Sequence, residues 1–212
     1  MDHAPSETTA TTVVFDLGGV LVHWDPRLLF AQVLEDDEDV EAFLAEIGFA
    51  EWNHEQDAGK PWVDAVAEHS AKHPHRAGAI AAYPERFPDS VTGPMDDSVA
   101  VLTELRDRGV RLLALTNWSA ELFPTVRHRL PFLDDFEGIV VSGEEGLAKP
   151  DPAIFRVLLD RHGVVPDETV YVDDVDRNVV AAANLGFRAY HFTDAESLRA
   201  HLVGQGLLDA RP

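Results

Sequence analysis

The sequence has no cysteine, and positive charge is scarce in it. Without cysteine the chain can form neither disulfides nor thiolate metal sites. Its 17 Lys and Arg residues stand against 38 Asp and Glu, which gives a formal net charge of −21. A field of this sign repels the phosphate backbone of nucleic acids, so we expect no nucleic-acid partner.

Long hydrophobic runs are also missing. The longest small or apolar stretches, such as AGAIAAY, are too short to span a bilayer, so we expect no membrane partner. The N-terminal MDHAPSETTATT has neither the basic start nor the apolar stretch of a signal peptide. These features predict a cytoplasmic protein with a disordered N-terminal tail over residues 1–10.

The remaining chain has two regions with different hydrophobicity patterns. Short apolar runs alternate with helical patterns from residue 99 onward, which predicts an α/β fold whose parallel sheet is covered by helices on both faces. The expected strands are 11–16, 110–117, 136–141, 169–174 and 188–194; the expected helices are 99–109, 119–130, 151–163, 177–186 and 195–208. Residues 26–92 show only helical patterns, which predicts an all-helical insert between the two parts of a core formed by residues 11–25 and 93–212.

Polar residues gather where the predicted strands end. In open parallel sheets, ligands bind beyond the carboxyl ends of the strands. The residues delivered there are Asp16, Thr116, Asn117, Ser142, Lys149, Asp173 and Asp174. Each of them alone is an ordinary turn former, helix cap or solvated charge. Their joint placement at successive strand ends is what predicts a site.

Such a site suits phosphoryl chemistry. Three crowded carboxylates repel one another unless a cation lies among them, and ligands that are all oxygen suit Mg²⁺. A carboxylate oxygen left free can form an aspartyl-phosphate intermediate. Lys149 would neutralise the same phosphate and Thr116 would donate a hydrogen bond to it.

Four short motifs carry a family resemblance. FDLGGVL, LTN, GLAKPDPAIF and VYVDDVDRNVVAAANLG follow one another between residues 13 and 193. Together they resemble the haloacid dehalogenase superfamily, whose members have a Rossmann-like core and, in one subclass, a helical C1 cap after the first strand. The resemblance implies Asp16 as nucleophile, Thr116 and Lys149 as phosphate ligands with Asn117 beside them, and Mg²⁺ bound by Asp16, Asp173, Asp174 and the Gly18 carbonyl. Asn178 stands where other members carry an additional acid.

Position 18 departs from the pattern. Phosphatases of this superfamily usually carry a second Asp there as general acid and base, and losing such a group commonly costs about 10²–10⁴ in rate. Members with FDLG resemble a branch that includes sugar-phosphate phosphatases, so hydrolysis stays open. His23 and His54 are candidate substitutes, and Trp24, Trp52 and His54 are candidate substrate contacts.

The function predicted from the sequence is therefore Mg²⁺-dependent hydrolysis of a small phosphate monoester, with a sugar phosphate as one option. A metal-independent 2-haloacid dehalogenase is the nearest alternative, because it also attacks with the first Asp and lacks the second. A non-catalytic binding module on a hydrolase scaffold is another alternative, kept open by Gly18. A receiver-type signalling domain uses similar residues but in a different order.

Overall fold

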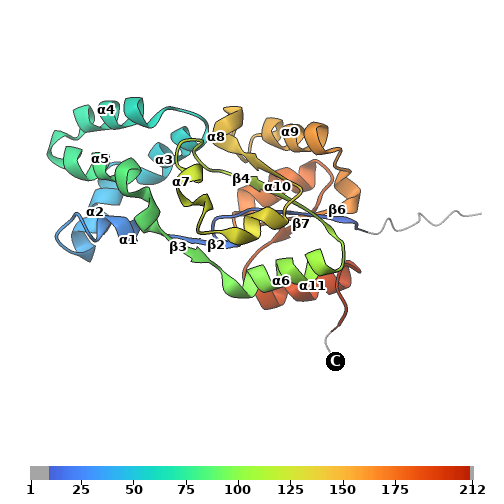
Figure 1. Ribbon diagram of the computed structural model, residues 1–212. Helices are drawn as coiled ribbons and strands as arrows, with labels where there is room; N and C mark the ends of the chain where they lie inside the picture. The colour runs from blue at the N-terminus through green and yellow to red at the C-terminus, as the bar shows by residue number, and fades with distance from the viewer. Residues whose placement is uncertain (1–9, 211–212) are drawn as a thin grey trace, which may run out of the picture.

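The core of the computed structural model is a five-stranded sheet in the order β5-β4-β1-β6-β7, with every neighbouring pair parallel (Figure 1). The structure describes residues 10–210, so the predicted disordered tail, apart from its last residue, lies outside the described residues. That last residue, Ala10, is buried. The strands are β1 (Thr12–Phe15), β4 (Arg111–Thr116), β5 (Gly138–Val141), β6 (Thr169–Asp173) and β7 (Arg188–His191).

Both faces of the sheet are buried, as the apolar strands predict. In β1, Val13 and Phe15 belong to one hydrophobic cluster and Val14 belongs to the other. The first cluster includes side chains of α6 (Asp96–Asp107), α7 (Phe123–Arg127) and α11 (Ala195–Gly204), and the second includes side chains of α9 (Pro152–His162) and α10 (Asp176–Asn184). The α/β fold with helices on both faces is confirmed.

A helical region is inserted after β1, as predicted, and lies beside one end of the sheet (Figure 1). Its helices are α1 (Pro26–Phe30), α2 (Asp37–Glu46), α3 (Phe49–Asp57), α4 (Trp62–Lys72) and α5 (Ala77–Arg86). Gly48 takes a left-handed φ of 60° between α2 and α3, which ends one helix and allows the next to begin. The first hydrophobic cluster continues from the sheet into these helices, so the inserted region packs firmly on the core.

Three local features differ from the sequence prediction. An antiparallel pair, β2 (Val22–Trp24) and β3 (Val91–Pro94), joins the inserted helices to the core and was not expected. The helix expected over 119–130 shrinks to α7, and residues 120–122 form a turn before it. The Ser119 hydroxyl accepts hydrogen bonds from the Glu121 backbone N–H and from the Trp62 indole. The loop after β5 begins with the short helix α8 (Ser142–Glu145). Single-turn 3₁₀ segments lie at Pro74–Arg76, Phe87–Ser90, Pro131–Asp135 and Pro166–Glu168.

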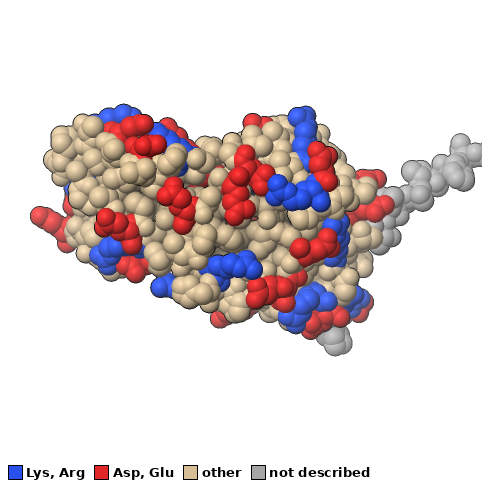
Figure 2. Space-filling model, turned by 45° about the horizontal axis from the view of Figure 1, so that its top comes forward, with Lys and Arg blue, Asp and Glu red and all other residues tan. Residues whose placement is uncertain are grey.

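On the face drawn in Figure 2, most blue basic groups stand next to red acidic ones. Arg106 pairs with Asp135, and Arg199 pairs with Glu104. This pairing works against a continuous basic surface of the kind that binds nucleic acid. Among the described residues no helix is long and apolar enough to cross a membrane.

Candidate active site

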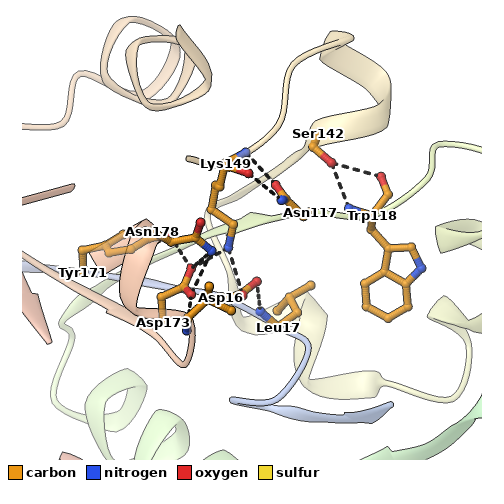
Figure 3. Close-up of polar contacts among 10 residues, drawn as sticks. Asp16, Leu17, Asn117, Trp118, Ser142, Lys149, Tyr171, Asp173 and Asn178 are labelled. Carbon is orange, nitrogen blue, oxygen red and sulfur yellow. Dashed lines mark hydrogen bonds and ion pairs between the residues drawn. The ribbon is translucent and has the colours of Figure 1, made fainter. Parts of the chain in front are cut away.

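Lys149 lies at the centre of the site, buried at the carboxyl ends of the strands (Figure 3). Its ammonium Nζ is 2.9 Å from Asp16 Oδ2 and 2.7 Å from Asp173 Oδ2. Asp16 directly follows β1 and Asp173 ends β6, and these two strands are parallel neighbours in the sheet. The topology therefore brings together three of the residues predicted to form the site.

The charges of this trio depend on one another. Burial of the Lys149 ammonium disfavours its charged form, but Asp16 and Asp173 outweigh that effect and raise the pKa of Lys149. Burial likewise disfavours the charged form of Asp173, yet Lys149 and hydrogen-bond donors keep the pKa of that carboxyl low. Burial, together with the charges of Asp173 and Asp174, raises the pKa of Asp16 to about 7 although Lys149 opposes the shift. The single positive charge of Lys149 therefore does not balance the negative charges of Asp16, Asp173 and Asp174.

Asp173 is held in place from several sides. The Tyr171 hydroxyl donates to its Oδ2 at 2.6 Å, and the Val175 backbone N–H donates to its Oδ1 at 2.9 Å. The Asn178 amide on α10 donates to both carboxylate oxygens, at 3.0 and 3.2 Å. A carboxylate fixed by this many donors keeps one orientation.

The donor set fits a divalent cation. Asp16, Asp173 and Asp174 each offer a carboxylate oxygen, and these atoms lie within 4.8 Å of one another. Burial and the neighbouring Asp173 charge raise the pKa of Asp174, which is a second sign of uncompensated negative charge. The buried Oδ1 of Asn178 has no hydrogen-bond partner, and a water on such a cation would satisfy it. Oxygen donors of this kind suit Mg²⁺.

Gly19 is required for the position of Asp174. A Cβ on Gly19 would lie 2.3 Å from Asp174 Oδ2, and the φ of +72° is strained for other residues. We expect Gly19→Ala to displace the carboxylate and weaken Mg²⁺ binding by about 10–100-fold, the usual effect of losing support around a metal ligand. Isothermal titration with Mg²⁺ measures this.

The matched control is Gly78→Ala. A Cβ at Gly78 on α5 has no atom within 4 Å, and Gly78 does not line the cleft, so this variant should bind Mg²⁺ like the wild type. Equal Mg²⁺ affinities for Gly19→Ala and wild type would show that Asp174 is not a ligand in the position seen here.

The two residues that end the β4 motif are both placed at the carboxyl end of that strand. Thr116 is buried at the end of β4. The Asn117 side chain exchanges two hydrogen bonds with the backbone of Lys149, one to its carbonyl at 3.0 Å and one from its N–H at 2.8 Å. The Asn117 amide therefore positions Lys149, and because Asn117 also lines the cleft, its predicted contact with substrate stays a prediction.

A cleft of about 630 Å³ opens beside these groups, between the core and the inserted helices. Its walls include Asp16, Gly18 and Asp174 from the core and the predicted contacts Trp24 and His54. A smaller cavity of about 70 Å³ adjoins it and is mainly aromatic, lined among others by Trp62, Tyr83, Phe87, Trp118 and Leu122. Gly18, Trp24, Asn53, Asp57 and Asn117 line both hollows, so the two meet along these residues.

Trp52 is not a substrate contact, contrary to the sequence prediction. Its side chain is 1% exposed and packs in the inserted region against Trp62, His69 and Tyr83. Helix α3 turns Trp52 and Gln56 inward and presents Asn53, His54 and Asp57 to the cleft, which Phe49 at the start of the helix also lines. The helical period of 3.6 residues separates these two faces of α3. This spacing could have indicated from the sequence that Asp57 shares a face with His54, but Asp57 was not predicted as a site residue.

The two histidines predicted as substitute proton donors lie in different places. His23 is exposed on β2, in register with Gly93. His54 is half-buried in the cleft wall, where burial and the charge of Arg177 lower its pKa. Arg177 itself, on α10, also lines the cleft and was not singled out from the sequence.

Comparisons with known proteins agree with this geometry. The chain is 30% identical to a sesquiterpene phosphatase of Aspergillus oryzae over 89% of this chain and 92% of that protein. Its fold resembles a haloacid-dehalogenase-family enzyme of Bacteroides thetaiotaomicron in a magnesium complex (TM-score 0.69, 22% identity, 92% and 98% coverage). It also resembles L-2-haloacid dehalogenase of Xanthobacter autotrophicus with chloropropionic acid covalently bound (TM-score 0.58, 18% identity, 94% and 85% coverage). Residues 10–186 match the sequence family of haloacid dehalogenase-like hydrolases, and the chain belongs to that family.

Proposed function

We propose that this hydrolase is a Mg²⁺-dependent phosphatase that cleaves a small phosphate monoester through an aspartyl-phosphate intermediate on Asp16. The observation that carries the proposal is the Asp16–Lys149–Asp173 assembly with Asp174 within ligand distance of the two acids. Asp16, Asp173 and Asp174 would hold the Mg²⁺, which supplies charge neutralisation at the substrate phosphate. Lys149 would stabilise the negative charge on the transferring phosphoryl group.

The relatives support phosphate chemistry over dehalogenation. The Aspergillus relative, which matches nearly the whole chain, is a phosphatase by name. A shorter match, 37% identical over 44% of this chain, is a phosphoserine phosphatase of Thermus thermophilus. An acidic pair that can hold a cation has a use in phosphoryl transfer, whereas the dehalogenase alternative needs no metal.

The aromatic cavity favours an organic group that is apolar near the ester oxygen. Rings and methyl groups make up most of its lining, from Trp62, Tyr83, Phe87, Trp118 and Leu122. The polar residues Asn53, Asp57, Asn117 and Ser119 also line it, but fewer polar than apolar groups face the space where a sugar would need a partner for each hydroxyl. We therefore place an apolar phosphate ester ahead of the sugar phosphate that the sequence suggested. The sesquiterpene phosphatase among the relatives is consistent with this choice.

The function is tested by phosphate release with and without free divalent cation. We expect the protein to hydrolyse p-nitrophenyl phosphate and prenyl phosphates in the presence of Mg²⁺. The kcat/KM for prenyl phosphates should be higher than that for hexose phosphates. EDTA should stop the reaction and excess Mg²⁺ should restore it, because the acidic cluster lacks positive charge without the cation. Halide release from a 2-haloacid that continues in EDTA, with no phosphate release from any ester, would support the dehalogenase in its place.

A further inference from the structure

We propose that Asp57 of the inserted helix α3 is the general acid and base of this site, in place of a carboxyl at position 18. The assignment rests on the proposed phosphatase function and adds the residue that moves the proton. Four features of the structure support it: the place of Asp57 between the two hollows, the open space at Gly18, the contacts that hold Asp57, and its ionisation.

Asp57 lies where the acidic cleft meets the aromatic cavity, since it lines both. A phosphate bound at Asp16 and Lys149 occupies the cleft, and an apolar organic group occupies the aromatic cavity. The oxygen that bridges them then lies at the junction, next to Asp57. A general acid must reach this bridging oxygen, because the proton goes there when the phosphorus–oxygen bond breaks.

The space at position 18 is open. A Cβ built on Gly18 meets no heavy atom within 4 Å, and Gly18 lines the same two hollows as Asp57. A side chain at position 18 would therefore extend into open space beside the two hollows that Asp57 also lines. The inserted helix supplies a carboxyl to this region from the opposite wall.

Asp57 is held by both parts of the protein. Its Oδ2 accepts a hydrogen bond from the Asn53 amide at 3.0 Å, and its carboxyl accepts another from the Ser119 backbone. The Asp57 backbone carbonyl accepts a bond of 2.6 Å from the Ser142 hydroxyl of the core. At the following turn a Cβ on Gly59 would lie 3.1 Å from Gly146 Cα, so the end of α3 packs closely on α8. A group fixed in this way is pre-organised for proton transfer.

The ionisation of Asp57 suits a group that both donates and accepts a proton. Burial raises its pKa to about 7, with a further contribution from the Asp16 charge, although the Ser119 hydrogen bond and Lys149 oppose the shift. A carboxyl with a pKa near the working pH is present in both protonation states. His54 is less suited, because burial and Arg177 disfavour the protonated form that an acid requires.

The proton balance closes over two steps. In the first, an Asp16 carboxylate oxygen bonds to phosphorus, the bond from phosphorus to the ester oxygen breaks, and the Asp57 proton moves to that oxygen, which leaves as an alcohol. In the second, Asp57 carboxylate accepts a proton from the water that attacks phosphorus. The bond between phosphorus and Asp16 then breaks, inorganic phosphate leaves, and both residues return to their starting states.

The test compares esters whose leaving groups differ in their need for a proton. Single-turnover rates of leaving-group release, with enzyme in excess and Mg²⁺ present, report the first step alone. We expect Asp57→Asn to lower this rate by about 10²–10⁴ for a prenyl phosphate, the usual contribution of a general acid. Dinitrophenyl phosphate, whose leaving group departs as a stable anion, should react nearly as fast as with the wild type. The control Asp64→Asn, at an exposed carboxyl on α4, should leave both rates unchanged.

Two further measurements separate an acid from a structural residue. Asn53→Ala keeps Asp57 but removes a donor that orients it, so it should show a smaller loss with the same preference for the prenyl ester. In the wild type the ratio of prenyl to dinitrophenyl rates should fall as the pH rises through about 7, where Asp57 loses its proton. Taking the ratio cancels the ionisation of protein groups that act on both esters alike. These are Asp16, His54 and Asp174 of the cleft, the buried Lys149, and Tyr83 on α5; Arg27 and Arg177 are the other charged residues that line the cleft.

The outcomes are distinct. Equal losses of Asp57→Asn on both esters, or no loss on either, would overturn the role of Asp57 while leaving the phosphatase function in place. Wild-type protein that releases phosphate from neither ester would overturn the proposed function, and this role with it.

Discussion

Replacement of Asp16 by Asn is expected to abolish phosphate release, with a loss of roughly 10⁴-fold or more in kcat, as for nucleophiles that act within a catalytic unit. An amide nitrogen or oxygen does not form the acyl-phosphate bond, and one carboxylate ligand of the proposed cation site is lost with it. Acid quenching with a radiolabelled ester should trap a phosphoenzyme in the wild type and none in Asp16→Asn.

The variant should remain folded. Lys149 keeps its 2.7 Å contact with Asp173, and the Leu17 N–H that donates to Asp16 Oδ1 can donate to an Asn oxygen in its place. Asp160→Asn, at an exposed carboxyl of α9, is the matched control and should retain full activity. A labelled phosphoenzyme in Asp16→Asn would assign the nucleophile to another residue.

Lys149→Met is expected to have the largest effect on stability. The ammonium is fully buried and is the shared partner of Asp16 and Asp173, so its removal leaves two carboxylates facing each other without a counter-charge. Removing one member of a buried ion pair typically costs about 3–5 kcal/mol in the free energy of unfolding. Urea denaturation of the metal-free protein measures this loss.

Mg²⁺ should recover part of the stability lost in Lys149→Met. A cation bound among the carboxylates replaces some of the missing positive charge, and any ligand that binds only the folded state stabilises it. Activity should stay low, because the phosphate has lost its ammonium partner. Lys72→Met, at an exposed residue of α4, is the control. A metal-free Lys149→Met protein as stable as this control would contradict the central place given to the buried ion pair.

The sequence determined the sheet and the residues at its edge. Each strand that contributes to the site is a short apolar run that ends in a polar residue or is directly followed by one, and parallel strands end at a common edge. For this reason Asp16, Lys149, Asp173 and Asp174 could be placed together although the first and last of them are 158 residues apart in the sequence. Local signals such as the Asp151 cap and the Gly163 stop fixed α9 in the same way.

The inserted helices were recognised as helical, but their faces could not be oriented. Whether Trp52 or Asp57 of α3 points at the cleft depends on how α3 is rotated against the core. That rotation is set by contacts between distant parts of the chain, including Ser142 with Asp57 and Trp62 with Ser119. The β2–β3 pair likewise joins segments that are far apart in the sequence.

The difference has a physical reason. The position of a strand end follows from the local pattern of apolar residues, which the amino-acid sequence shows directly. The rule that parallel strands end at one edge of the sheet then brings these ends together. The face that an inserted helix turns toward the active site is chosen by side-chain packing and close backbone approach, such as that of Gly59 to Gly146. The sequence alone therefore determined where the proposed phosphate and cation chemistry belongs, and the tertiary structure alone decided that Asp57 faces this place.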